Sequence, residues 1–179
     1  MVIINKNISL KKIKLKDSES LFQLMKVVYT KAYSYLWEEQ GEWYLNLNWT
    51  QDQVLKELND TKASYYFVLV NDEYKGVLRF IEDAEFKDMK ENMSLKLHRL
   101  YLDDSIQGKG VGKHIMTWVE QYAKDNDYNG VWLEAMDTKV QALEFYKRCG
   151  YKITSNFRLD FKRMHSKYRG MHNMYKTLE

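Results

Sequence analysis

The chain has 179 residues, 45% of them hydrophobic, which suffices for one well-packed domain and is short for two. Its 28 basic and 25 acidic residues leave a net charge of only +3, so no large single-sign field indicates nucleic acid as a partner. One cysteine, Cys149, excludes an intrachain disulfide framework and a multi-cysteine metal site, and it fits a reducing compartment.

The N-terminus lacks the pattern of a signal peptide or a membrane span. Asn5 and Lys6 interrupt the apolar run of residues 1–4 before an apolar segment of either kind can form. We therefore expect a cytoplasmic protein with no membrane partner. A first strand is predicted at residues 8–15, and Asp17-Ser18-Glu19-Ser20 is typical of a helix start.

An aromatic and acidic stretch occupies residues 29–49, after which Thr50 is a suitable N-cap for a further helix. Two strands, at 65–70 and 74–81, follow and are separated by the turn formers Asn71-Asp72-Glu73. This spacing predicts a hairpin. The charged residues 82–93 predict a loop.

The second half of the chain alternates strands and helices. In chain order the pattern predicts a strand at 95–102, a helix at 113–124, a strand at 131–135, a helix at 139–148 that stops at Gly150, and strands at 151–160 and 171–177. A run of strands followed by alternating strands and helices predicts a mixed sheet and the class α+β or α/β.

Three glycines, Gly108, Gly110 and Gly112, lie between the strand at 95–102 and the helix at 113–124. Glycines let a backbone approach a ligand closely, and a helix N-terminus presents unpaired N–H groups, so this loop predicts a phosphate site. The dinucleotide pattern G-x-G-x-x-G does not fit, because the third glycine comes one residue early. A Walker loop does not fit either, since positions 107 and 114 hold glutamine and histidine.

The remaining pattern, Q/R-x-x-G-x-G at residues 107–112, resembles the acyl-CoA loop of the GNAT N-acetyltransferase superfamily. A second segment, residues 142–151, resembles that family's A-x-x-F-Y-x-x-x-G-[FY] element. Residues 100–103 and 171–178 are similar to two of its strands. One departure is Lys139, where the family often has an asparagine that contacts the pantetheine arm, and Asp137 is the expected substitute.

The resemblance implies one GNAT-like domain over residues 1–179. Its mixed central sheet of about six to seven strands is flanked by helices, and two central parallel strands splay around the cofactor. The expected subdivisions are acceptor-side helices at about 17–60, an acyl-CoA core at about 94–151 and C-terminal strands at about 151–178. Exposed late strands permit a homodimer.

The resemblance also implies acetyl-CoA as cofactor, with CoA as product, and no metal. The backbone N–H of Leu102 is expected to face the thioester carbonyl. The implied cofactor-binding residues are Leu100, Tyr101, Leu102, Gln107, Gly108, Lys109, Gly110, Val111, Gly112, Lys113, Asp137 and Tyr146.

Acetyl transfer to an amine needs an acid for the departing thiolate and a base for the ammonium. Tyr146, at the family's tyrosine position, is the implied acid, and packing alone is the alternative. A phenol with a pKa of about 10 matches a thiolate of comparable basicity. Glu134 is our candidate base. The other candidates are Asp137, His98, Glu38, Glu39 and Glu42.

The acceptor is expected to meet residues 37–44, where rings and carboxylates suit a cationic amine. The candidates are Trp37, Glu38, Glu42 and Trp43. This content is similar to that of bacterial acetyltransferases of the polyamine type, whereas the structural alternative is a helix pair with core rings and solvated glutamates. We expect N-acetylation of a small cationic amine. Acetylation of a protein N-terminus or lysine, or a non-catalytic acyl-CoA-binding regulatory module, is the alternative.

Overall fold

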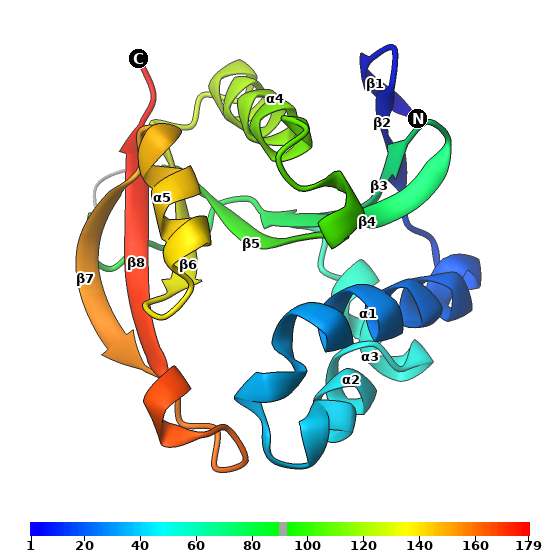
Figure 1. Cartoon of the computed structure of the whole chain (residues 1–179). Helices are drawn as coiled ribbons and strands as arrows, with labels where there is room; N and C mark the ends of the chain where they lie inside the picture. Colours follow the sequence, from blue (N-terminus) through cyan, green and yellow to red (C-terminus); the bar gives the residue numbers. More distant parts are fainter. Residues whose placement is uncertain (90–92) are drawn as a thin grey trace. The chain divides into compact units, whose positions relative to one another are not determined.

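The computed structural model describes residues 1–89 and 93–179, and Figure 1 shows the course of the chain. These residues form eight strands of one sheet in the order β1-β2-β3-β4-β5-β6-β8-β7. The chain comprises two compact units, one of residues 1–80 with 99–114 and the other of residues 81–98 with 115–179. The predicted mixed α/β architecture with a helix-flanked sheet is confirmed, but the sheet of the described residues has eight strands rather than the expected six to seven.

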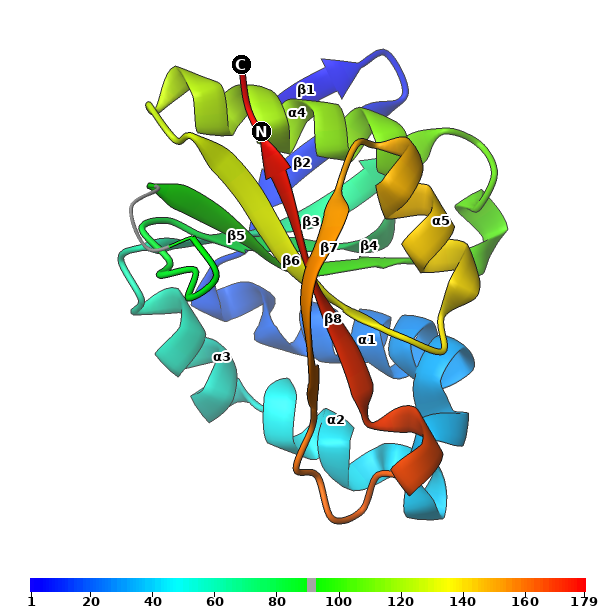
Figure 2. The same cartoon turned by 90° about the vertical axis from the view of Figure 1, so that its left-hand side faces the viewer.

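The first unit contains the N-terminal strands and three helices that lie together on one side of β3 and β4, as both Figure 1 and Figure 2 show. Its elements are β1 (Val2–Asn5), β2 (Ile8–Lys12), α1 (Ser18–Tyr33), α2 (Glu42–Asn48), α3 (Gln51–Leu58), β3 (Ala63–Val70), β4 (Glu73–Ile81) and the end of β5 (Ser94–Leu102). The last residue of β4, Ile81, belongs to the second unit. Short 3-10 turns lie at η1 (Leu15–Asp17), η2 (Ser34–Leu36), η3 (Glu38–Gly41) and η4 (Asp104–Ile106).

Two turns of this unit follow directly from side-chain chemistry. The predicted hairpin is confirmed, because Asn71 and Asp72 adopt φ angles of 50° and 66°, which suit the tight two-residue turn between β3 and β4. The strand β1 was not predicted. Asn5, which interrupts the apolar run, accepts hydrogen bonds from the amides of Asn7 (2.9 Å) and Ile8 (3.0 Å) and so forms the turn of a β1–β2 hairpin.

The second unit contains the remaining strands. Its elements are the start of β5, most of α4 (Val111–Asp125), β6 (Gly130–Met136), α5 (Val140–Arg148), β7 (Lys152–Arg158), η5 (Ser166–Tyr168) and β8 (Gly170–Thr177). The strands β5 and β6 are parallel neighbours, with Ser94–Leu97 paired to Gly130–Leu133. The strand β8 is antiparallel to both β6 and β7. The expected stop of α5 at Gly150 is confirmed by its φ of 94°.

The predicted loop at 82–93 is free of helix and strand over residues 82–89 and 93, whereas residues 90–92 lie outside the described residues. None of the helices in the described part of the chain combines the length and the hydropathy needed to cross a bilayer.

Candidate functional site

The glycine loop joins η4 to the first turn of α4. Gly108 and Gly110 adopt φ angles of 74° and 77°, in the left-handed region that favours glycine. No described atom beyond the neighbouring residues lies within 4 Å of the position that a Cβ would take at either glycine. The loop is exposed, while Ile106 before it and Val111 after it are buried and anchor its two ends. The backbone of the loop is therefore open to a ligand.

The helix α4 begins immediately after this loop. The amide of His114 donates to the carbonyl of Gly110 over 3.1 Å, which is the first bond of the helical ladder. The amides of the preceding turn, at residues 111–113, come before that ladder and have no acceptor within the helix. Together with the helix dipole they favour an anion. A diphosphate fits this site, because the two glycines leave room for its close approach and the amides of residues 111–113 can donate to it.

The end of β5 lies beyond the residues that pair with β6, which are Ser94–Leu97. The amide of Asp103 donates to the carbonyl of Lys75 on β4 over 2.8 Å. Because successive amides of an extended strand point to opposite edges, the Leu102 N–H points away from β4. The Leu100 N–H points to the same edge. This orientation is the one expected for a donor to the thioester carbonyl.

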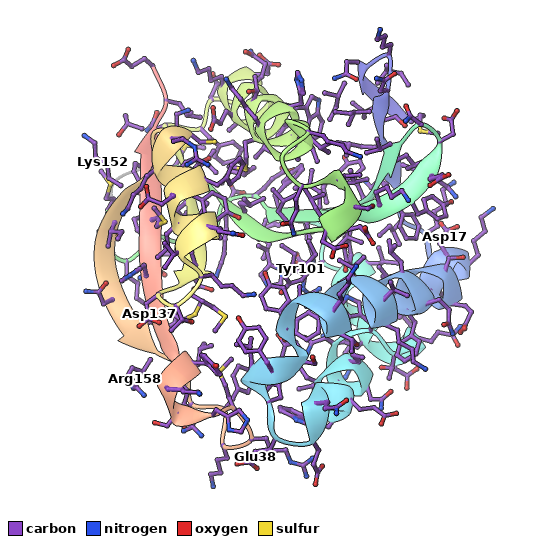
Figure 3. All side chains as sticks on the ribbon, in the orientation of Figure 1. Asp17, Glu38, Tyr101, Asp137, Lys152 and Arg158 are labelled. Carbon is purple, nitrogen blue, oxygen red and sulfur yellow. The ribbon has the colours of Figure 1, made fainter. Side chains whose placement is uncertain are left out.

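The side chain of Tyr101 lies against α1 and against Trp49, which follows α2. Its ring meets Tyr29 and Tyr33 of α1 edge-on, with centroids 5.7 Å and 5.6 Å apart, and Trp49 at 6.2 Å. Figure 3 shows Tyr101 reaching from β5 toward α1. Burial raises the pKa of Tyr33 to about 12 and that of Tyr101 well above its usual value of 10. These phenols therefore stay protonated at neutral pH.

Of the predicted acceptor residues, Trp37 is buried and Trp43 half-buried. The Trp37 ring stacks on Tyr44 at 4.5 Å, and its Nε1 donates to the Tyr29 hydroxyl over 2.9 Å, so this ring packs in the core. The burial of Trp37 favours the structural alternative for that residue.

Two predicted carboxylates, Glu38 and Glu42, are exposed, and Figure 3 labels Glu38 on the turn before α2. Between them Glu39, Gln40 and Gly41 all have left-handed φ angles of 53°, 58° and 75°. The turn thus separates a buried ring from exposed carboxylates, which remain accessible to a cation.

A buried ion pair beneath the tyrosines was not predicted. Arg99 of β5 donates through Nη1 to Glu57 of α3 over 2.6 Å, and both side chains are less than a tenth exposed. Burial opposes the charge of Arg99, but Tyr65 and Glu57 outweigh it and raise its pKa. The sequence does contain a signal for this pair, because Arg99 is a charged residue at an inward-facing position of β5, between Leu97 and Tyr101.

In the second unit, Glu134 is exposed on β6 and forms an ion pair with Lys96 of β5, with Nζ 3.0 Å from Oε1. The Lys96 ammonium also lies 4.3 Å from the centroid of the Trp132 ring. The candidate base is thus held by a cation. His98, another candidate, is half-buried on β5.

Asp137 follows β6 and contacts the start of β8. Its amide donates to the Gly170 carbonyl over 3.1 Å. A Cβ at Gly170 would stand 1.8 Å from the Asp137 carboxylate, so the absence of a side chain at Gly170 lets the two strand ends meet. Figure 3 shows Asp137 at this end of β6.

Tyr146 lies on α5 and is half-buried. Its ring is 5.2 Å from Phe145 and 6.0 Å from Tyr151, and its carbonyl accepts hydrogen bonds from the amides of Cys149 and Tyr151, each over 3.0 Å. The helix end therefore fixes the position of Tyr146. Tyr146, Glu134 and Asp137 belong to the second unit, whereas Leu102 and the loop 107–113 belong to the first.

A family model decides the classification. The acetyltransferase (GNAT) family model matches residues 22–151. The chain belongs to the acetyltransferase (GNAT) family. This membership confirms the predicted enzyme class, an N-acetyltransferase, and the predicted cofactor, acetyl-CoA.

Relatives of this GNAT chain include an uncharacterized N-acetyltransferase in the pepI 3'region of Lactobacillus delbrueckii subsp. lactis, 26% identical over 108 residues, or 60% of this chain. The match spans 62% of that relative, less than two thirds of its length. The spermine/spermidine N(1)-acetyltransferase of Bacillus subtilis (strain 168) is 27% identical over 109 residues, 58% of this chain and 70% of the relative.

The fold is similar to that of the PaiA N-acetyltransferase of Thermoplasma acidophilum, solved in complex with coenzyme A. The TM-score is 0.72 at 17% identity, covering 95% of this chain and 98% of that one. The likeness confirms the GNAT fold expected from the glycine loop and the second motif.

Proposed function

We propose that the chain transfers the acetyl group of acetyl-CoA directly to the primary amine of a small cationic molecule, with polyamines as the favoured class. The observation that carries this proposal is one continuous segment of the first unit. It runs from the outward-facing Leu102 amide, through η4, to the glycine loop and the open N-terminus of α4. Acyl transfer from CoA requires one hydrogen-bond donor to the thioester carbonyl and several donors to the diphosphate. The Leu102 end of this segment offers the first, and the glycine loop with the α4 N-terminus offers the others.

The first unit supplies main-chain donors. Acetyl-CoA, when bound, supplies the acetyl group as an activated thioester. The loop at 107–113 holds the diphosphate through the amides of its last residues, 111–113, at the start of α4, and the Leu100–Leu102 edge pairs with the pantetheine arm. The Leu102 N–H donates to the thioester carbonyl and stabilises negative charge that develops on its oxygen. Asp137 and Tyr146 complete the proposed cofactor contacts.

The proton transfers are assigned to two side chains of the second unit. Tyr146 protonates the departing thiolate, and Glu134 takes the proton that the acceptor ammonium must lose. The ion pair with Lys96 supports this role for Glu134 because it orients the carboxylate. A Tyr146→Phe variant keeps the ring contacts with Phe145 and Tyr151 and removes only the hydroxyl, so it isolates the proposed acid.

Two observations support the proposed acceptor class: the negative charge of two exposed side chains and the activity for which one relative is named. Glu38 and Glu42 are exposed carboxylates beside Trp43, and they can pair with ammonium groups of a polyamine. The Bacillus subtilis relative named a spermine/spermidine N(1)-acetyltransferase supports the same acceptor class.

The proposal is tested by incubating the chain with acetyl-CoA and a panel of acceptors while free thiol is measured. The panel comprises spermidine, spermine, putrescine, a peptide with a free N-terminus and a lysine peptide with a blocked N-terminus. We expect turnover above hydrolysis with the polyamines. Turnover confined to a peptide would replace the acceptor class, and saturable CoA binding without any turnover would indicate a regulatory module.

A further inference from the structure

Three side chains of the second unit meet at the last turn of α5. They are Glu120 of α4, Tyr151 just beyond α5 and Lys176 of β8. We infer that Lys176, held in place by Glu120, is a positioning residue that fixes the ring of Tyr146 through Tyr151. The inference rests on the proposed function, since it assumes that Tyr146 protonates the departing thiolate.

The ion pair between Lys176 and Glu120 joins β8 to α4. The Lys176 Nζ donates to Glu120 Oε2 over 2.6 Å, and the two side chains are 26% and 15% exposed. Solvent screens such a partly buried pair less than an exposed pair such as Lys147–Glu144 of α5, whose side chains are about half exposed. The pair therefore determines the course of the Lys176 side chain.

The Lys176 side chain lies against the end of α5. A Cβ at Gly150 would stand 3.3 Å from Cε and 3.6 Å from Cδ of Lys176, so the lysine stem passes closely over this glycine. The ammonium lies 5.9 Å from the centroid of the Tyr151 ring. A cation at this place is favourable to the ring and to the helix C-terminus, where the dipole is negative. Lys176 thus contacts the residues that end α5.

Tyr151 connects Lys176 to Tyr146. Its side chain is buried, and its ring centroid lies 6.0 Å from that of Tyr146 at an interplanar angle of 67°. Its amide donates to the Tyr146 carbonyl over 3.0 Å. Burial raises the pKa of Tyr151 well above its usual value, and the nearby Glu120 carboxylate raises it further, so the phenol stays neutral beside the ion pair. Because the two tyrosines are joined by both backbone and ring, a displaced Tyr151 displaces Tyr146.

The consequence concerns proton transfer rather than cofactor binding. A general acid must lie within hydrogen-bond reach of the atom that it protonates, and a misplacement of about 1 Å can cost about a hundredfold in rate. Loss of the Lys176 ammonium should therefore lower kcat. The KM for acetyl-CoA should change little, because the proposed diphosphate donors lie in the first unit.

The test is a double-mutant cycle with Tyr146→Phe. Lys176→Met keeps a stem over Gly150 and removes the ammonium, and we expect it to lower kcat about tenfold, with Lys176→Arg restoring most of the rate. In the Tyr146→Phe background, Lys176→Met should lower kcat no further, because the hydroxyl that it positions is absent. A merely structural role would lower kcat equally in both backgrounds.

The matched control is Lys147→Met, which removes a positive charge from the same turn of α5. Lys147 pairs with Glu144 on the exposed side of the helix, so this variant should keep the natural kcat. Glu120→Gln repeats the comparison if Lys176→Met melts at a lower temperature. It keeps an acceptor for Lys176 but removes the charge that holds it, and kcat should again fall only where the Tyr146 hydroxyl is present.

A second readout does not depend on turnover. In NMR spectra of the chain labelled on its tyrosine rings, the Tyr146 signal is assigned by its absence in Tyr146→Phe. This signal should shift in Lys176→Met and stay in place in Lys147→Met. An unmoved signal in both Lys176→Met and Glu120→Gln, or an equal loss of kcat in the two backgrounds, would overturn the inference. Absence of turnover with every amine, or full kcat in Tyr146→Phe, would instead defeat the proposed chemistry, and the NMR comparison would still decide whether Lys176 positions Tyr146.

Discussion

A Cβ at Gly76 would stand 2.2 Å from the carbonyl oxygen of Tyr101, which is closer than any methyl group can approach a backbone atom. The same Cβ would lie 2.9 Å from Cδ2 and 3.1 Å from Cα of Leu102. The glycine therefore lets β4 press directly on the segment of β5 whose next amide faces the proposed thioester. The backbone of β4 sets the position of Leu102.

We predict that Gly76→Ala lowers stability by about 1–3 kcal/mol, because the clash is with backbone and no rotamer relieves it. Because the clash displaces the Leu102 amide, kcat should also fall, and by more than the loss of stability alone explains. Chemical denaturation and steady-state kinetics measure the two effects. Gly170→Ala is the comparison, since its Cβ would meet the exposed Asp137 carboxylate, which can swing aside, so its loss of stability should be smaller. Equal losses in the two variants would argue against this account.

The glycine loop gives a second prediction. Ala at Gly110 costs about 1 kcal/mol for the left-handed conformation, and the open space around its Cβ adds no clash in the free protein. When CoA is bound the methyl group meets the diphosphate, so KM for acetyl-CoA should rise about tenfold or more. Gly150→Ala also forces a left-handed residue, with φ of 94°, but lies outside the loop. Its melting temperature should fall similarly while KM stays unchanged. If both variants changed KM equally, strain rather than the diphosphate contact would be responsible.

The Arg99–Glu57 pair predicts strong non-additivity. Arg99→Met leaves the Glu57 carboxylate buried, with Arg79 3.9 Å away as a poor substitute, and should cost about 3–5 kcal/mol. The double variant Arg99→Met with Glu57→Met should be more stable than the Arg99→Met single variant. Urea unfolding measures each step of this cycle. The exposed pair Lys147–Glu144, 2.9 Å apart, serves as control and should show no measurable coupling in the same cycle, because solvent screens both charges. Additive losses at Arg99 and Glu57 would contradict the account.

The buried tyrosines predict an alkaline limit to stability. Burial raises the pKa values of Tyr29, Tyr33, Tyr44 and Tyr65, that of Tyr33 to about 12. In the unfolded chain these phenols titrate near a pKa of about 10, so between the two values the unfolded state has lost protons that the folded state retains. The free energy of unfolding should be constant below about pH 9 and fall as the pH rises from about 10 to 12. Phenolate absorbance and circular dichroism should change together there. Ionisation of all tyrosines near pH 10 without unfolding would show that the cluster is not buried.

Local pattern predicted the second half of the fold well. The helix α4, the strands β5 and β6, and the stop of α5 at Gly150 all follow from hydrophobic period and from glycine and turn chemistry over short windows. That β5 and β6 are parallel neighbours was implied by the family resemblance. The strand β1 was missed because Asn5 was interpreted as the end of an apolar run, whereas its side chain forms the β1–β2 hairpin turn.

The candidate site was harder to predict because its contacts join distant residues. The glycine loop is contiguous and was recognisable. The contact of Tyr33 with Tyr101, the pairing of Arg99 with Glu57 and the approach of Gly76 to Tyr101 depend on how strands and helices pack. Periodicity shows that such residues face inward but does not show which partner they meet. Trp37 was expected to contact the acceptor, but it is buried, and the sequence pattern did not show which partners it packs against.

Amide hydrogen exchange with and without coenzyme A tests the central claim most directly. We predict that CoA slows exchange at Leu102 and at residues 111–113, where the proposed donors lie, and leaves the exposed hairpin at Asn71 and Asp72 unchanged. Saturating CoA that protects other segments while exchange at Leu102 and the loop stays the same would contradict the assignment of this backbone as the cofactor site.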